Sequence, residues 1–245
     1  MVLLDGKALS AKIKEEVKVE VAQIVKEKEI TPGLAVILVG NDAASATYVA
    51  SKAKACKEAG IYSVVHEMPD SITQEELLET INMMNNNPKL DGILVQLPLP
   101  KHIDTTIVLE AINPLKDVDG FHPYNVGRMV SNLDSFLPAT PFGVMRMFEE
   151  HNIELSGKNV VVIGSSDIVG KPMASLLINA KATVTVCNSR TKDLKSHTLK
   201  ADIVVIAVGV PYLLKEDMVK DGAVVIDVGI NRLDTGKLVG DADFE

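Results

Sequence analysis

Cysteine is scarce in this sequence of 245 residues, which contains only Cys56 and Cys187. Two cysteines cannot form the disulfide framework of a small secreted protein. Cys56 falls in a predicted helix and Cys187 in a predicted strand, so we interpret both as small buried apolar groups. This composition favours a cytoplasmic protein whose fold depends on a hydrophobic core.

The chain also lacks an excess of positive charge and any long apolar run. Its 33 acidic and 25 basic side chains give a formal net charge of -8, whereas nucleic acids and anionic membranes select clustered positive charge. No stretch approaches the roughly 18 apolar residues of a membrane span. The apolar stretch within residues 1–7 is too short for a signal peptide. We therefore expect neither nucleic acid nor a membrane as a partner.

Helical and strand-like segments alternate in the first half of the chain. Apolar residues between positions 9 and 25 recur at close to 3.6 residues, which predicts an amphipathic helix. Continuous apolar runs, typical of parallel strands covered on both faces, lie at 34–39 and 92–97. Between them we predict a helix at 43–59, a strand at 62–67 and a helix at 73–85. Thr73 and Glu76 have the spacing of a capping box at the start of the last helix.

A second alternation follows residues 120–141, which are rich in Pro, Gly, Asn and Ser and are predicted to be an irregular domain junction. Thr140 is expected to cap a helix that has Pro141 in its first position. Strands are predicted at 159–163, 183–187, 203–208 and 223–228, with a helix at 171–179. We therefore predict an α/β protein with two doubly wound domains, 1–138 and 139–245, that flank a cleft, the second domain being of the Rossmann type.

The segment from Gly164 to Gly170 connects a predicted strand to a predicted helix. Gly164 would permit a tight turn and Gly170 a close approach of helix and strand, while N–H groups at the helix start could bind a pyrophosphate. We interpret Asp167 as a capping group of this helix. Serine replaces the second glycine of the common G-x-G-x-x-G motif, so an ordinary strand-to-helix turn is the alternative.

The next predicted strand ends at Cys187 and carries no acidic residue that could bind a ribose 2'-hydroxyl. The Ser189 hydroxyl and the Arg190 guanidinium follow it and could bind a 2'-phosphate instead. This pattern favours NADP over NAD as the cofactor. The alternative is that Arg190 is a solvated surface charge.

Polar groups also stand out in the first half. Tyr48 and Lys52 lie one helical turn apart, about 6 Å on one helix face, so they could offer an aromatic ring and an ammonium to one ligand. Gln96 lies in an apolar strand, where a buried amide needs hydrogen-bond partners. Asp119 precedes Gly120. Taken singly, Lys52 could be a solvated charge, Asp119 a turn residue and Tyr48 a half-buried core aromatic.

In this order, the motifs resemble the bifunctional methylenetetrahydrofolate dehydrogenase/methenyltetrahydrofolate cyclohydrolase family. The similarity covers essentially the whole chain. It includes Val39-Gly40, Ser45-x-x-Tyr48-x-x-x-Lys52, Val95-Gln96-Leu97-Pro98-Leu99-Pro100, Lys116-Asp117-Val118-Asp119-Gly120, Pro138-Ala139-Thr140-Pro141 and Asp227-Val228-Gly229-Ile230-Asn231. The resemblance implies that a homodimer oxidises 5,10-methylenetetrahydrofolate with NADP and hydrolyses the methenyl product to 10-formyltetrahydrofolate.

The resemblance also implies the roles of single residues. Lys52 matches the catalytic lysine, Gln96 the residue that holds and tunes it, Tyr48 the ring that stacks on the aminobenzoate or pterin, and Asp119 the pterin-binding aspartate. All four are candidate catalytic residues. Further candidates are Ser45, Val95 and Leu97 for the substrate, and Gly164, Ser165, Ser166, Ser189, Arg190 and Ile230 for the cofactor. The five histidines have no ligand-like spacing, so we predict no metal.

The sequence departs from the family pattern at several positions. Ala139 stands in place of the usual cysteine, Asn188 in place of a frequent histidine, and Ser165 where some members carry arginine. The family pattern continues past Glu245 with a glycine-rich loop and a last helix, which this sequence does not contain. Two alternatives stay open: a shikimate-type NADP dehydrogenase that uses Lys52 and Asp119 as its Lys–Asp pair, and a nucleotide-binding module that is inactive because this tail is absent.

Overall fold

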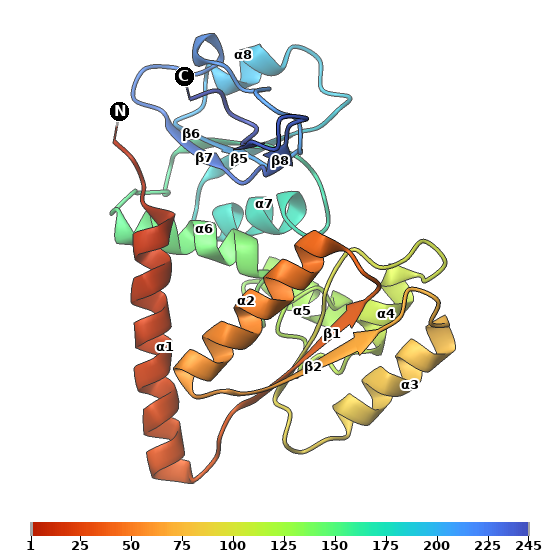
Figure 1. The fold of residues 1–245 in the computed structure, drawn as a ribbon. Coiled ribbons are helices and arrows are strands. Elements are labelled where there is room, and N and C mark those ends of the chain that lie inside the picture. Colours follow the sequence, from red (N-terminus) through yellow and green to blue (C-terminus); the bar gives the residue numbers. More distant parts are fainter. Residues whose placement is uncertain (1, 245) are drawn as a thin grey trace. The chain divides into compact units, whose positions relative to one another are not determined.

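The structure is a computed structural model that describes residues 2–244 (Figure 1). The chain divides into two compact units, Met1–Asn125 and Val126–Glu245. Each unit is built on a parallel sheet that is packed with helices. The predicted α/β fold with two parallel-sheet domains is therefore confirmed.

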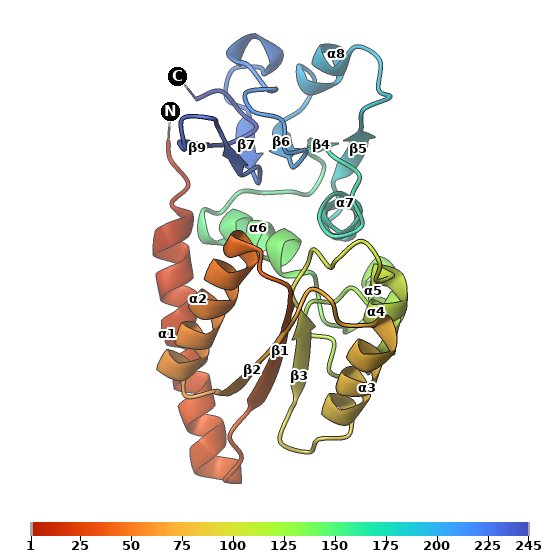
Figure 2. The ribbon, with the colours of Figure 1, turned by 45° about the vertical axis from the view of Figure 1, so that its right-hand side comes forward.

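The sheet of the first unit has the strand order β2-β1-β3, and all its strands are parallel. Helix α2 covers one face with α1 packed along it, and α3 and α4 cover the other face (Figure 2). The bounds are α1 Gly6–Lys28, β1 Gly33–Val39, α2 Ala43–Ala59, β2 Tyr62–Met68, α3 Gln74–Asn85, β3 Gly92–Val95 and α4 Thr105–Ala111.

Strand β1 is apolar throughout because both of its faces are buried. Ala35 and Ile37 belong to the core cluster that contains Leu77 of α3. Val36, in contrast, packs in the cluster that contains Val49 of α2. This two-sided burial is the physical reason why the strand reads as one continuous hydrophobic run.

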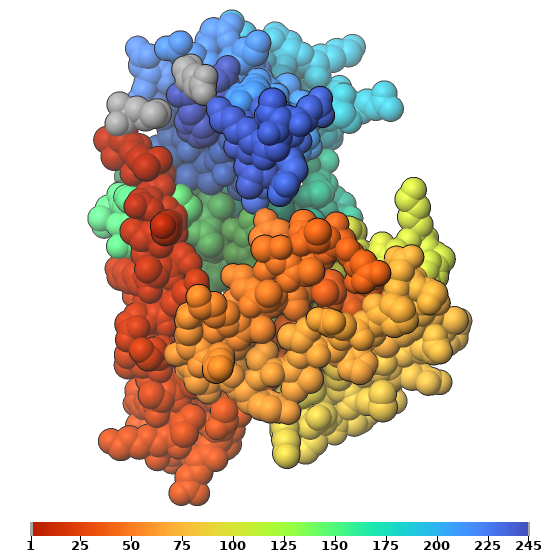
Figure 3. All heavy atoms as spheres, viewed as in Figure 1, coloured from red at the N-terminus to blue at the C-terminus, as the bar shows by residue number. Residues whose placement is uncertain are grey.

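The helix ends in the first unit follow local sequence signals. Thr73 and Glu76 form the predicted capping box: the Glu76 N–H donates to Thr73 Oγ1 at 3.2 Å, and the Thr73 N–H donates to Glu76 Oε2 at 2.9 Å. Asp42 caps α2 by accepting the Ser45 N–H at 2.7 Å, and Gly60 ends that helix in the left-handed region at φ 80°. Helix α1 is exposed along much of its length, with only Leu9 and Val21 buried (Figure 3).

The sheet of the second unit has the order β5-β4-β6-β7 and is also parallel. Helices α6 and α7 pack together, and α7 contacts β4 and β5. The short helix α8 lies on the opposite side of the sheet (Figure 2). The bounds are α5 Pro123–Val130, α6 Ala139–Glu150, β4 Asn159–Ile163, α7 Gly170–Asn179, β5 Thr183–Cys187, α8 Leu194–Thr198, β6 Ile203–Ile206, β7 Val224–Asp227, β8 Asn231–Arg232 and β9 Leu238–Val239.

Two expectations for the region between the sheets are wrong. Residues 120–141 are not irregular throughout, because α5 occupies Pro123–Val130. Its start is held by the Asp117 carboxylate, which accepts the Phe121 and His122 N–H groups, a contact that composition does not reveal. Thr140 does not cap α6 but lies inside that helix, whose N-cap position is Pro138.

No helix within residues 2–244 is long and apolar enough to cross a membrane.

Candidate active site and nucleotide site

Three polar side chains gather at the carboxyl ends of β1 and β3. Lys52 is on α2, which follows β1, and Gln96 directly follows β3. Asp119 belongs to a segment that runs parallel to β3, with Asp117 level with Ile93. Asp119 lies in the turn that follows this bridge, close enough to Lys52 for the ammonium to lower its pKa. Parallel α/β sheets bind ligands at the carboxyl ends of their strands.

The side chains of Lys52 and Gln96 are in direct contact. Lys52 Nζ donates to Gln96 Oε1 at 3.0 Å, and Gln96 Nε2 donates to the Leu97 carbonyl oxygen at 2.8 Å. An amide with its oxygen and nitrogen exchanged would satisfy neither bond, so these two partners fix its orientation. The Lys52 ammonium has three donors and uses one of them on Gln96, which leaves donors for a ligand or water.

Asp119 is half-buried, and its pKa is shifted further from the ordinary value than that of any other side chain described in this site. Burial disfavours its charged form and raises its pKa to about 6; the Lys52 ammonium acts in the opposite direction, while the Asp117 carboxylate raises the pKa further. Asp119 is therefore ionised at neutral pH but titrates within reach of it. Its carboxylate can accept hydrogen bonds from a ring that presents two donors.

The other predicted substrate residues differ in exposure. Tyr48 is 50% exposed and lies one turn before Lys52, so its ring is open to a ligand. Ser45 is buried, and its N–H and hydroxyl donate to Asp42, which holds the pKa of that carboxyl below its ordinary value. Val95 is buried in β3. Leu97, which precedes Pro98 in a cis peptide bond, contributes the carbonyl oxygen that holds Gln96.

Two residues that the sequence did not single out complete this region. Asp117 and Asn125 are both buried, and Asn125 Nδ2 donates to Asp117 Oδ2 at 2.8 Å. The only signal in the sequence is an aspartate two residues before Asp119, which a turn also explains.

In the second unit, the segment between β4 and α7 requires glycine at both ends. Gly164 has φ 120°, and an added Cβ would lie 2.4 Å from the Ala207 carbonyl oxygen. A Cβ on Gly170 would lie 2.2 Å from the Gly164 carbonyl oxygen. The tight turn predicted at Gly164 and the close approach predicted at Gly170 are both confirmed.

Ser166, and not Asp167, accepts hydrogen bonds from the backbone at the start of α7. Ser166 Oγ accepts the Val169 and Gly170 N–H groups at 3.2 and 3.3 Å. The Asp167 carboxylate instead pairs with Lys171 Nζ at 2.5 Å, one helical turn later. The interpretation of Asp167 as a cap is therefore wrong, since α7 has no side-chain cap at its N-cap residue. Ser165 is half-buried beside Gly164.

Ser189 and Arg190 lie in a tight turn after β5. The Arg190 N–H donates to Asn188 Oδ1 at 2.9 Å, and the Asn188 N–H donates to Thr191 Oγ1 at 2.8 Å. Both Ser189 and Arg190 are exposed, and within residues 2–244 the Arg190 guanidinium makes no hydrogen bond or ion pair. The glycine turn is adjacent, because the Gly164 N–H donates to the Cys187 carbonyl oxygen at 2.8 Å.

Ile230 follows β7 at the carboxyl edge of the same sheet and is 66% exposed. Its neighbours are fixed by two acidic side chains. The Gly229 N–H donates to Asp227 Oδ1 at 2.9 Å, and Asn231 Nδ2 donates to Asp241 Oδ1 at 2.8 Å. The backbone therefore presents Ile230 to solvent from a rigid loop.

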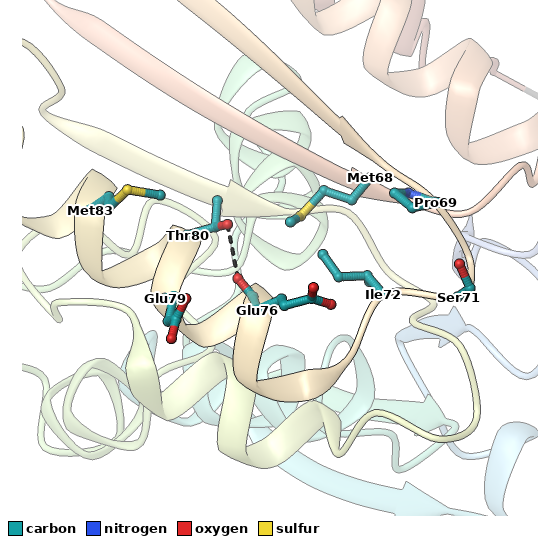
Figure 4. A pocket seen from close by; sticks show the side chains of 8 residues that line it. All are labelled: Met68, Pro69, Ser71, Ile72, Glu76, Glu79, Thr80 and Met83. Carbon is teal, nitrogen blue, oxygen red and sulfur yellow. Dashed lines mark hydrogen bonds between the residues drawn. The ribbon is translucent and has the colours of Figure 1, made fainter.

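A surface hollow of about 490 Å³ lies elsewhere in the first unit, between α3 and the end of β2 (Figure 4). It is lined by Met68, Pro69, Ser71, Ile72, Glu76, Glu79, Thr80 and Met83. Glu76 is engaged in the capping box and Thr80 donates to the Glu76 carbonyl oxygen. None of Lys52, Gln96 and Asp119 lines this hollow, so it is distinct from the polar cluster. Within residues 2–244, no group of three or more His, Cys, Asp or Glu side chains is placed to hold a metal ion.

Comparison with known proteins gives matches along the whole chain. Residues 4–119 match the family model for the tetrahydrofolate dehydrogenase/cyclohydrolase catalytic domain, and residues 138–245 match the model for the NAD(P)-binding domain of the same family. The chain is 89% identical over 245 residues to the bifunctional protein FolD of Aliarcobacter butzleri. The aligned region covers 100% of this chain and 85% of that protein.

Solved structures show the same similarity. The bifunctional methylenetetrahydrofolate dehydrogenase/cyclohydrolase FolD of Campylobacter jejuni is 57% identical with a TM-score of 0.97, over 100% of this chain and 86% of that one. The FolD enzyme of Trypanosoma brucei, solved with NADP cofactor and inhibitor, is 38% identical with a TM-score of 0.95, over 99% of this chain and 86% of that one.

Proposed function

The chain belongs to the tetrahydrofolate dehydrogenase/cyclohydrolase family, and from this membership we propose how its residues carry the two reactions. It is a bifunctional enzyme. It oxidises 5,10-methylenetetrahydrofolate to the 5,10-methenyl form with NADP, and it hydrolyses that product to 10-formyltetrahydrofolate. The observation that carries the assignment of residues is the 3.0 Å contact between Lys52 Nζ and Gln96 Oε1, at the sheet edge that also holds Asp119.

The folate binds to the first unit through Asp119 and Tyr48. The aminopyrimidinone ring of a pterin presents adjacent N–H donors, which fit the two oxygens of an ionised carboxylate such as Asp119. The half-exposed Tyr48 ring offers a flat apolar surface on which the pterin or aminobenzoate ring stacks. Ser45, Val95 and Leu97 shape the backbone around these two contacts.

Hydrolysis requires proton transfer near the one-carbon bridge. A water oxygen adds to the cationic methenyl carbon and loses one proton, which is released and leaves a neutral hydroxyl intermediate. The hydroxyl then gives up its proton as the C=O bond forms and the bond from that carbon to N5 breaks, and N5 takes up this second proton. The products are 10-formyltetrahydrofolate and one released proton. Lys52 Nζ is the group that exchanges these protons, and Gln96 holds it in place through its side-chain oxygen.

Hydride transfer needs orientation more than acid–base chemistry. NADP, when bound, accepts the hydride from the one-carbon bridge. In the second unit, Gly164, Ser165 and Ser166 provide the turn for the pyrophosphate, and Ile230 provides an apolar contact. Ser189 and the unpaired Arg190 bind the 2'-phosphate. The NADP complex of the Trypanosoma brucei relative supports this choice of cofactor.

The proposal also includes a domain boundary, a cellular compartment and an oligomeric state. We place the functional boundary at 138/139, so that residues 1–138 bind folate and carry the catalytic lysine while residues 139–245 bind NADP. We also propose that the enzyme is cytoplasmic, since both cysteines are free and buried and the function needs neither a membrane nor nucleic acid, and that it is a homodimer, as the resemblance to the family implies.

The test is to incubate the purified chain with 5,10-methylenetetrahydrofolate and either NADP or NAD. We expect equal amounts of NADPH and 10-formyltetrahydrofolate, with a much slower reaction when NAD replaces NADP. Absence of NADPH formation, or accumulation of the methenyl compound at its uncatalysed rate of hydrolysis, would contradict the proposal.

A further inference from the structure

Asp117 is a buried carboxylate that the two reactions do not use directly. Its side chain is 1% exposed. Asp117 Oδ1 accepts the Phe121 N–H at 3.3 Å, and Oδ2 accepts the His122 N–H at 2.9 Å and Asn125 Nδ2 at 2.8 Å. A carboxylate this deeply buried is retained only when several donors compensate for the water that it has lost.

These bonds fix the loop that carries Asp119 from one side, and β3 fixes it from the other. The Ile93 N–H donates to the Lys116 carbonyl oxygen at 2.7 Å. Val118 packs so closely on β3 that a Cβ on Gly92 would lie 2.5 Å from Val118 Cγ1. The turn closes with a bond from the Gly120 N–H to the Asp117 carbonyl oxygen at 3.1 Å. Asp119 therefore has little freedom to move.

We propose that Asp117 is a positioning residue for the folate reactions. Its buried carboxylate holds the turn that presents Asp119 to the pterin ring, and its negative charge partly offsets the positive charge of Lys52 near Asp119. This inference rests on the proposed function, in which Asp119 binds the pterin.

The charges around Asp119 come from two elements. Burial is the main cause that raises the pKa of Asp119 to about 6; Lys52 on α2 is positive and lowers this pKa, whereas Asp117 in the same loop is negative and adds to the rise. Gln96, at the end of β3, is uncharged. Two further titratable side chains belong to this loop: the His122 Nδ1 accepts the Tyr124 N–H at 3.0 Å, and Lys116 Nζ donates to the Asn87 carbonyl oxygen at 3.0 Å. Removing the charge of Asp117 should therefore move the titration of Asp119 to lower pH.

Two variants separate the charge of Asp117 from its hydrogen bonds. Asp117→Asn removes the charge and weakens the bonds, whereas Asn125→Ala removes one of the same bonds and leaves the charge. Titration of the Asp119 carboxyl by carbon NMR, assigned with Asp119→Asn, reads the charge effect in the intact chain without turnover. Steady-state kinetics with 5,10-methylenetetrahydrofolate read the positioning effect.

In Asp117→Asn we expect the Asp119 midpoint to fall by at least about half a pH unit, and the KM for the folate to rise more than kcat falls. In Asn125→Ala we expect a raised KM with an unchanged midpoint.

An unchanged midpoint in Asp117→Asn, or an equal change in both variants, would overturn the inference. Asp117→Ser is a second neutral variant if Asp117→Asn does not fold. A wild-type chain that forms no NADPH would contradict the proposed function instead, while the carboxyl titration would still be readable.

Discussion

At the scale of single residues, the burial of Asp119 makes the stability of the protein depend on pH. Its pKa in the folded protein is about 6, against 3.8 for an unperturbed aspartate. Between these values the folded state binds more protons than the unfolded state, so the contribution of Asp119 to stability declines as pH rises from about 4 to about 6. Above pH 6 the folded protein keeps a partly buried charge that the unfolded chain would expose to water.

Replacing Asp119 by asparagine should therefore stabilise the free enzyme more at pH 8 than at pH 5. Part of the effect is already present at pH 5, which lies between the two pKa values, so the gain at pH 8 relative to pH 5 is expected to be about 1 kcal/mol, allowing for residual solvent around the side chain. Urea denaturation of both proteins at the two pH values measures it. Asp104→Asn, a change at an exposed helix cap, is the control and should show no such gain; equal gains at pH 5 and pH 8 for Asp119→Asn would refute the burial effect.

We propose that a second single residue, Arg190, sets the choice of cofactor. Its guanidinium is exposed and unpaired within residues 2–244, so its replacement by alanine should leave the fold intact. A charge-assisted contact with the 2'-phosphate is worth roughly 1.5 to 3 kcal/mol, or about ten- to a hundredfold in affinity. We expect Arg190→Ala to weaken NADP binding by this factor and NAD binding hardly at all. Lys192→Ala, a change two residues along on the exposed surface, is the control and should change neither affinity. Calorimetric titration measures both affinities. An unchanged affinity of Arg190→Ala for NADP would contradict the proposed contact with the 2'-phosphate.

At the scale of elements, the turn between β4 and α7 depends on glycine. Gly164→Ala would place a methyl group 2.4 Å from the Ala207 carbonyl oxygen at a φ of 120°, so the turn must move. We expect at least a tenfold loss of NADP affinity, because we propose that backbone N–H groups of this turn bind the pyrophosphate, together with a lower melting temperature.

Gly143→Ala is the matched control for that prediction. Gly143 lies within α6, and a Cβ there meets nothing within 4 Å. Because alanine is favoured over glycine inside a helix by about 1 kcal/mol, this variant should gain stability and keep its affinity for NADP. If Gly164→Ala bound NADP as well as Gly143→Ala does, the turn would not be the pyrophosphate site.

Elements with a local or periodic signal were predictable from the sequence. Strand β4 and helix α2 have the predicted bounds, because an apolar run or a capped helix is encoded by neighbouring residues. Helix α5 was not, since its first turn is held by Asp117, which precedes the helix by six residues. The candidate residues Lys52, Gln96 and Asp119 were predictable because they lie in short motifs that resemble a family. The contact between Asp117 and Asn125 joins residues eight positions apart and became visible only in the structure.

At the scale of the whole molecule, the two units divide the chemistry between them. The residues proposed for proton transfer and for the pterin contact, Lys52, Gln96 and Asp119, lie in the first unit. The glycine turn and Arg190 lie in the second. A substitution at Lys52 should therefore abolish one reaction without altering the affinity for NADP.

The most direct measurement is the rate of hydrolysis of 5,10-methenyltetrahydrofolate by Lys52→Met, beside Lys54→Met as the control. Lys54 is on the same helix, but its side chain is 77% exposed and pairs with Glu58. We expect Lys52→Met to lose at least about a hundredfold in rate, the scale for loss of a general acid–base group, while substrate and NADP still bind and Lys54→Met keeps the wild-type rate. Wild-type hydrolysis by Lys52→Met would show that Lys52 does not transfer the proton.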